Sequence, residues 1–165
     1  MKQLLTFIAL PLLAFNAYAK DVTITGNVQS KCVINTHTAG VYGNPTADKL
    51  STATEDGGVA PVIRYDVSLA GAYDARITTP TSFSSGPSLD DVVNWTGLTS
   101  VKEVGDAAMG DYESNKVTYN STTEYDLHTA GSTWFKVDSY AEYGYGKAFP
   151  SGQYVAIVVA ECIAK

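Results

Sequence analysis

The chain has 165 residues, with 11 basic and 17 acidic side chains, 11 tyrosines, 14 glycines and two cysteines. This acidic balance argues against binding to nucleic acid or to anionic lipid, because both are negatively charged. The length is that of one domain with a single sizeable core.

The first residues have the pattern of a secretory signal peptide. A basic start at Lys2 precedes an apolar run over 4–15, and Ala-Tyr-Ala at 17–19 fits the small-x-small cleavage rule. The apolar run is shorter than the roughly 20 residues that span a bilayer. We therefore expect residues 1–19 to be cleaved on export. The remaining chain, from Lys20, is expected to be soluble and carries a net charge of −7.

The segment that follows the expected cleavage site, DVTITGNVQSKC at 21–32, alternates like a β-strand. Chain ends are usually frayed, so a ready-made strand at this position is unusual. It could be an ordinary edge strand of a complete domain, or it could pair with another chain. The residues on one side of this extended segment are Val22, Ile24, Gly26 and Val28.

The two cysteines, Cys32 and Cys162, are expected to form a disulfide, the usual state of cysteines in an exported chain. The bond would close a loop of about 130 residues and stabilise the fold by roughly 5 kcal/mol in the chain-entropy model. Two separate thiols or an intermolecular pair are the alternatives. The spacing of cysteines and histidines matches no zinc pattern, and no metal site is expected.

The body of the chain reads as short strands between turn residues, rich in Tyr, Thr, Val and Ser. One short helix is expected at 88–95, where Ser88 and Asp91 resemble a capping box. Loops are expected at 35–48, 51–60, 82–88 and 106–115. The expected strands are 62–69, 74–79, 95–101, 116–120, 134–141 and 153–163, the last apolar on both faces and so a central strand. This pattern is typical of an all-β, immunoglobulin-like sandwich in one domain.

The two ends of the chain resemble the chaperone–usher pilins of Gram-negative bacteria. The resemblance rests on the alternating segment that contains Gly26, on Cys32 a few residues further on, and on the closing sequence FPSGQYVAIVVAEC. Pilins are incomplete immunoglobulin-like domains that lack their last strand. The N-terminal extension of the next subunit fills the resulting groove by strand addition.

This resemblance implies a signal peptide (1–19), a donor-strand extension (20–30) and an incomplete pilin sandwich (31–165). It implies a structural subunit of a surface pilus, or fimbria, that polymerises by donor-strand exchange and supports adhesion. The partners would be other pilus subunits, a periplasmic chaperone and an outer-membrane usher. The donor residues would be Val22, Ile24, Gly26 and Val28. A Cys32–Cys162 bond would tie the first strand to the last, and these two strands flank the groove in the pilin layout.

Two other classes of function stay open at this stage. One is a complete secreted β-sandwich that binds a carbohydrate or protein ligand as a monomer, for which a surface around Tyr140, Tyr143 and Tyr145 is a candidate. The other is a small hydrolase, but His37 and His128 have no evident acid partner at short range, so no enzyme or cofactor is expected. The acidic residues with no recognisable metal-loop spacing are Asp90, Asp91, Glu103, Asp106, Asp111 and Glu113.

Overall fold

The computed structural model describes residues 23, 25, 26 and 31–165. Strands dominate this part of the chain, and its helical segments are short: α1 (Tyr112–Asn115) and single 3-10 turns at Thr54–Asp56 and Ala107–Met109. The fold is therefore all-β, as the composition predicts. The expected signal peptide (1–19) and most of the expected extension (20–30) lie outside the described residues.

The larger sheet is built around one long strand, β10, which pairs on one side with β7 along most of its length. On its other side β10 pairs first with β4 and then with β3, and β1 and β2 extend the sheet beyond these two strands. Every pairing is antiparallel. The six strands are β1 (Cys32–Thr38), β2 (Gly43–Thr46), β3 (Lys49–Ser51), β4 (Val62–Val67), β7 (Val93–Val104) and β10 (Gly131–Tyr143).

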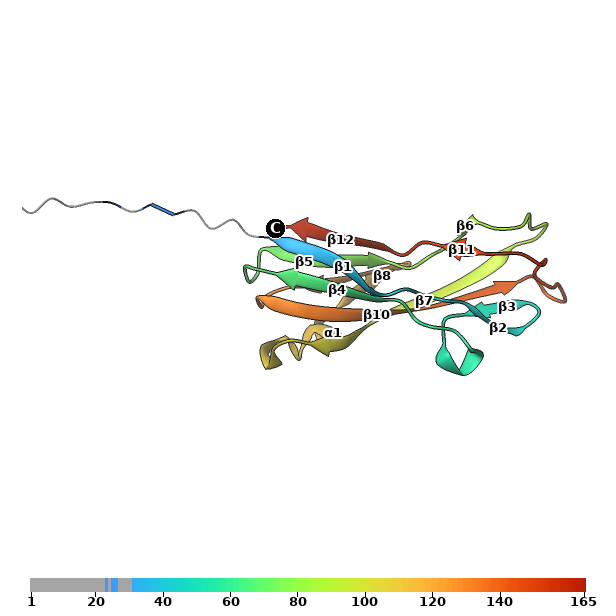
Figure 1. Ribbon diagram of the computed structural model, residues 1–165, viewed down its shortest axis with the longest axis horizontal. Helices are drawn as coiled ribbons and strands as arrows, with labels where there is room; N and C mark the ends of the chain where they lie inside the picture. Colours follow the sequence, from blue (N-terminus) through green and yellow to red (C-terminus); the bar gives the residue numbers. More distant parts are fainter. Residues whose placement is uncertain (1–22, 24, 27–30) are drawn as a thin grey trace, which may run out of the picture.

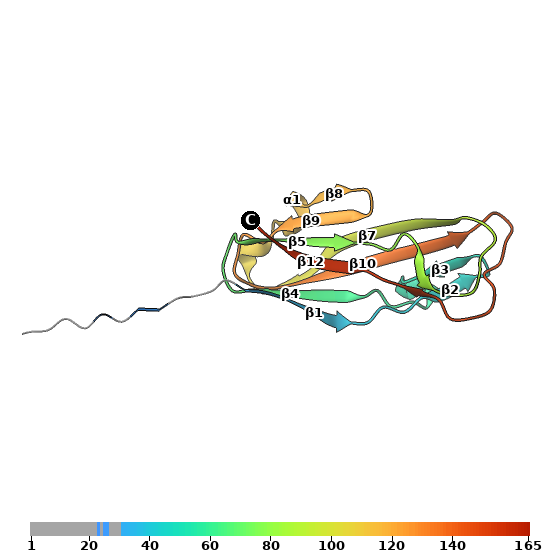
Figure 2. The same cartoon turned by 90° about the horizontal axis from the view of Figure 1, so that it is seen from above.

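A second sheet faces the first and has the strand order β12-β5-β9-β8. Its strands are β5 (Tyr73–Thr78), β8 (Val117–Tyr119), β9 (Thr122–Asp126) and β12 (Val159–Ala164). Two short strands, β6 (Phe83–Ser85) and β11 (Val155–Ala156), form a separate ribbon at the far end of the molecule. The two layers are seen in Figure 2, and Figure 1 shows the chain ending beside the start of β1.

The core lies between the two sheets and follows from the two-residue period of the strands. Tyr65 on β4 and Phe135 on β10 meet edge to face at 5.4 Å, and Tyr125 on β9 lies 4.4 Å from Phe135. All three side chains are buried. The Tyr65 hydroxyl lies within donating distance of the carbonyls of Arg76 (3.3 Å) and Glu161 (3.2 Å), so this side chain bridges the two sheets.

Three expectations about secondary structure are wrong. The region of the expected helix at 88–95 contains the start of β7 at Val93, because pairing with β10 overrides a two-turn helical pattern. The expected loops at 35–48 and 82–88 contain strands β2 and β6 and the end of β1. Strand β9 is not predicted by the sequence analysis, although Thr123 and Tyr125 in it and Leu127 directly after it alternate and are all buried.

The closing segment also differs from expectation. The sequence predicts one central strand over 153–163, apolar on both faces. The structure instead has two pieces, β11 and β12, and among the described residues β12 is an edge strand that pairs only with β5. An apolar pattern on both faces shows that the residues avoid water. It does not show whether they are covered by their own chain or by another one.

Candidate functional site

Two edge strands from different sheets lie next to each other. In the described chain, β1 pairs only with β4 and β12 pairs only with β5. They are in contact and run side by side in Figure 1. We call the line between β1 and residues 155–164 the seam. Each edge strand presents backbone N–H and C=O groups that have no ladder partner, which makes the seam a template for a further strand.

The side chains that point inward along the seam touch the core but are covered incompletely. Ile34 on β1, together with Val158, Ala160 and Cys162, packs against the buried cluster while remaining only partly buried. The next strands in have fully covered inward residues, such as Tyr65 and Ile77, each 0% exposed. The core is therefore less protected at the seam than one strand further in.

A groove of about 770 Å³ lies at the end of the seam away from Cys32. Its residues come from the chain after β1, from β3 and β10, and from the segment that leads to β12. Val158 both lines this groove and packs against the core, so the groove and the seam are continuous. The residues that give it its apolar character include Tyr42, Leu50, Pro61, Phe149, Tyr154 and Val158.

The outward face of the closing segment is apolar and exposed. Val155 is 40% exposed, Ile157 58% and Val159 47%. Together with the inward Val158 and Ala160, they make this segment apolar on both faces, as its sequence shows. Isolated surface valines are common, but three exposed apolar residues at alternating positions, the last of them on the edge strand β12, favour contact with another chain.

On the opposite side of the sandwich, the edge of β7 is protected differently. The backbone N–H of Val101 on β7 donates to Glu113 Oε2 (2.7 Å). The Thr99 carbonyl accepts from Lys116 Nζ (2.9 Å) and from the Tyr125 hydroxyl (3.0 Å). Side chains thus satisfy backbone groups at the free edge of β7, a common way to block strand addition. Among the described residues, no side chain does this for β1, and for β12 only Tyr65 reaches a carbonyl, from inside the sandwich.

The disulfide expected from the sequence is present at one end of the seam. Cys32 and Cys162 are bonded, with their Cα atoms 6.3 Å apart and a sequence separation of 130. The bond joins β1 to β12, which share no hydrogen-bonded ladder. It is therefore a covalent link between the two sides of the seam.

Of the expected donor residues, Val22, Ile24 and Val28 lie outside the described residues. Gly26 is described and is exposed, and no described atom lies within 4 Å of the place that a Cβ would take on this residue. Thr23 and Thr25 are also exposed, and none of these three described residues belongs to a strand. At these three positions the segment does not pair with its own domain.

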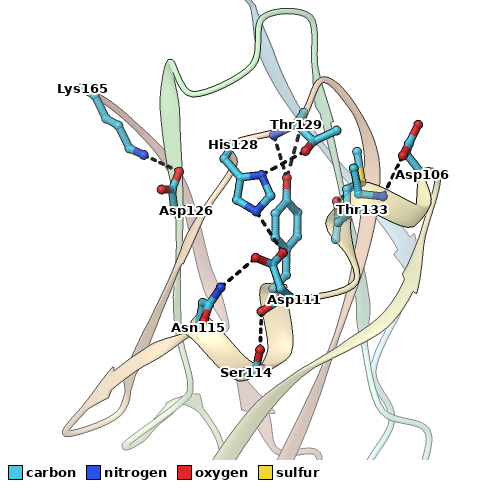
Figure 3. Close-up of polar contacts among 12 residues, drawn as sticks. Asp106, Asp111, Ser114, Asn115, Asp126, His128, Thr129, Thr133 and Lys165 are labelled. Atoms are coloured by element: carbon cyan, nitrogen blue, oxygen red, sulfur yellow. Dashed lines mark hydrogen bonds and ion pairs between the residues drawn. The ribbon is translucent and has the colours of Figure 1, made fainter.

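Neither histidine lines the groove at the end of the seam. His37 is on β1, with its ring edge-on to Trp134 at 6.3 Å. His128 follows β9, and its two ring nitrogens lie 3.0 Å from Asp111 Oδ1 and 3.0 Å from Thr129 Oγ1 (Figure 3). The prediction of a solvated His128 without an acid partner thus missed Asp111, 17 residues away in the sequence.

The contacts of this cluster favour a structural role. The Thr129 N–H donates to the Tyr112 hydroxyl (3.1 Å), and Asn115 donates to Asp111 (2.8 Å), so the cluster fixes α1 against the loop after β9. The side chains of His128 and Asp111 are 37% and 49% exposed. Neither residue lines the groove at the end of the seam.

The other candidate residues do not converge. Among the described residues, no group of three or more His, Cys, Asp or Glu side chains could hold a metal ion. Asp90 instead accepts from the Tyr143 hydroxyl and pairs with Lys147 (2.9 Å), and these contacts hold the pKa of Asp90 below its ordinary value. Tyr143 is buried while Tyr145 is fully exposed, so the candidate tyrosine surface does not form.

Comparisons of this chain with protein-family models, with curated proteins and with solved structures find no match. In the described part of the chain, no helix has the length and hydropathy needed to span a bilayer.

Proposed function

We propose that this protein is a structural subunit of a bacterial surface pilus that polymerises by donor-strand exchange. The observation that carries the proposal is the seam: two adjacent free strand edges over an incompletely covered core, continuous with a groove lined by both apolar and polar residues. Strand addition to a sheet edge is the recognition mode that such a surface fits.

The strand order supports an immunoglobulin-like sandwich that lacks its last strand. In that fold one sheet has the order A-B-E-D and the other contains C, F and G. Here β1-β4-β10-β7 follows the first order, and β5 and β12 occupy the places of C and F. The free edge of β12 is then the position where strand G would pair, and β8 and β9 are additional strands on the far side of β5.

The N-terminal segment has the length and pattern to fill this position. Residues 155–164 span about 33 Å as an extended chain, and the alternating segment 21–29 spans about 30 Å. Burying Val22, Ile24 and Val28 would contribute about 1.5–3 kcal/mol each. Backbone hydrogen bonds to the seam would add about 1 kcal/mol net apiece.

An extension that enters the seam of another copy makes a head-to-tail contact that does not close on itself, and so builds a filament. Before assembly the open edges and the exposed Val155, Ile157 and Val159 would promote aggregation. The proposal therefore includes a periplasmic chaperone that covers the seam and an outer-membrane usher that exchanges it for the next extension. The assembled protein would lie on the cell surface and support adhesion.

The test compares two versions of the chain that both start at Ser30. One ends at Lys165, and the other carries residues 21–30 after Lys165 through a flexible linker. Because β12 ends at Ala164, beside the seam, the added segment can turn back along it. We expect the second version to be a soluble monomer with a thermal midpoint about 15–30 °C higher, from about 4.5–9 kcal/mol of apolar burial.

The matched control carries the same added segment with Ile24→Asp and Val28→Asp, which keeps its length and removes its apolar face. This control is expected to behave like the version without the segment. Equal midpoints for all three, with all of them soluble, would mean that the sandwich is complete without the extension, and the proposal would fall.

One observation favours the second candidate, a secreted sandwich that binds a ligand as a monomer. The groove combines the aromatic side chains of Tyr42 and Tyr154 with the amides of Asn44 and Gln153, a mixture suited to a sugar. This candidate predicts that the version ending at Lys165 is soluble by itself and binds a glycan on an array.

A further inference from the structure

The Cys32–Cys162 disulfide joins two strands that have no other direct linkage by backbone pairing. β1 belongs to the larger sheet and β12 to the smaller one, and each pairs with a different neighbour. A bond within either sheet would reinforce an existing ladder. This bond instead connects the two sides of the seam.

The position of Cys32 in the chain gives the bond a second property. Cys32 begins β1 and follows the extension (20–30) almost directly. Lys31 is held only by Ser68, through Lys31 N–H to Ser68 Oγ (2.7 Å) and Ser68 N–H to the Lys31 carbonyl (3.0 Å), among the described hydrogen bonds. A pull on the extension therefore reaches Cys32 with little resistance before it.

The partner cysteine lies in the strand that borders the seam on the other side. Cys162 is in the middle of β12. Lys165, which follows β12, anchors the end of this strand. Its backbone N–H donates to the Ala72 carbonyl (3.1 Å), and its ammonium group pairs with Asp74 (3.1 Å) and Asp126. A strand seated in the seam would pair with β12. The disulfide thus connects the residue where a subunit's own extension begins to the strand that would hold the extension of a neighbouring subunit.

We propose that the Cys32–Cys162 disulfide is a mechanical link that passes tension from a subunit's own extension directly to the strand that holds its neighbour's extension. This inference rests on the proposed function. Without the bond, a pull at Cys32 acts on the end of β1, an edge strand held to β4 by hydrogen bonds that can open one after another. With the bond, the load follows a covalent path to β12, and the β1–β4 ladder does not carry it alone.

The test pulls on single molecules. The chain is tethered through its N-terminal extension, and a synthetic peptide with the sequence of residues 21–30, attached to the second handle, is captured in the seam. For the oxidised chain we expect the peptide to detach without prior lengthening of the domain. After reduction, or with Cys32→Ser and Cys162→Ser together, we expect β1 and the chain up to β4 to peel away first. Residues 32–61 would release up to about 100 Å before the peptide detaches.

If the double variant does not fold, reduction of the folded, tethered chain still tests the proposal. If the double variant folds, adding reductant to it shows any effect of the reductant other than breaking the disulfide. Equal detachment forces without lengthening, in oxidised and reduced chains that both capture the peptide, would overturn the mechanical role and leave the proposed function standing. Capture of the peptide by neither form would remove the seated strand itself, and both proposals would fall together.

Discussion

The inward and outward faces of the closing segment allow a matched test of what the seam holds. Val158 and Ile157 are neighbours on one stretch of chain: Val158 packs against the core and lines the groove, while Ile157 is 58% exposed on the outer face. We predict that Val158→Asp weakens the seating of a strand in the seam and that Ile157→Asp has little effect on it.

The magnitude follows from what covers each position. In the open seam an aspartate at position 158 would stay in contact with water, because Val158 is only partly buried. A seated strand would exclude that water, and a carboxylate without a partner would then cost several kcal/mol. Taking about 3 kcal/mol, Val158→Asp should lower the thermal midpoint of the version with residues 21–30 added after Lys165 by about 10 °C. Ile157→Asp should cost less than about 1 kcal/mol, because surface positions rarely cost more.

The assay is thermal unfolding followed by circular dichroism, with the same two substitutions also placed in the control version that carries Ile24→Asp and Val28→Asp. Subtracting the control removes any direct effect of each substitution on the domain. If both aspartates lower the midpoint equally after this subtraction, the strand does not cover the inward face of the seam, and the reasoning fails.

Three further predictions concern the domain itself. Tyr65→Phe removes the hydroxyl that reaches Arg76 and Glu161 and should lower the free energy of unfolding by about 1 kcal/mol, measured by urea titration, whereas Tyr145→Phe at a fully exposed position should leave it unchanged. Burial raises the pKa of the Tyr65 and Tyr125 hydroxyls above their ordinary value, so both stay protonated in the folded state. The contribution of these two groups to the free energy of unfolding should be constant below pH 10 and fall above it by up to about 1.4 kcal/mol per pH unit for each tyrosine. The double Tyr→Phe variant should therefore lose stability less steeply above pH 10 than the unchanged chain, in urea titrations at each pH. His128→Ala removes the exposed contact with Asp111 and should cost no more than about 1 kcal/mol in thermal unfolding; a larger loss would mean that this cluster holds α1 more firmly than its exposure indicates.

The strands that can be predicted from the sequence are those with one buried face. The alternation at 62–69 becomes β4 and that at 134–141 becomes part of β10, because one face of each strand packs on the core. β9 escapes prediction because Glu124 and Asp126, on its outer face, make the segment look like a loop. The spacing of Thr123, Tyr125 and Leu127 is the signal that could have identified it.

The candidate site is predictable only in its components. The Cys32–Cys162 bond can be predicted from the sequence because a chain with two cysteines has one intramolecular pairing. The contact between His128 and Asp111 cannot be predicted from the sequence, because α1 and the loop after β9 are brought together by the fold and not by sequence spacing. The same is true of Glu113 and Lys116, whose role at the edge of β7 depends on where α1 lies.

The sequence by itself determined that the protein is all-β and that the closing segment is apolar on both faces, and it predicted the Cys32–Cys162 disulfide that the structure contains. These are local properties, set by the two-residue period of a strand and by the chemistry of each side chain. Only the tertiary structure decided that the closing segment is an edge strand and that its free edge lies beside that of β1. Hydrophobicity states that a surface avoids water, but which surface remains uncovered depends on how the sheets are ordered in space, and that order arises from contacts between distant parts of the chain.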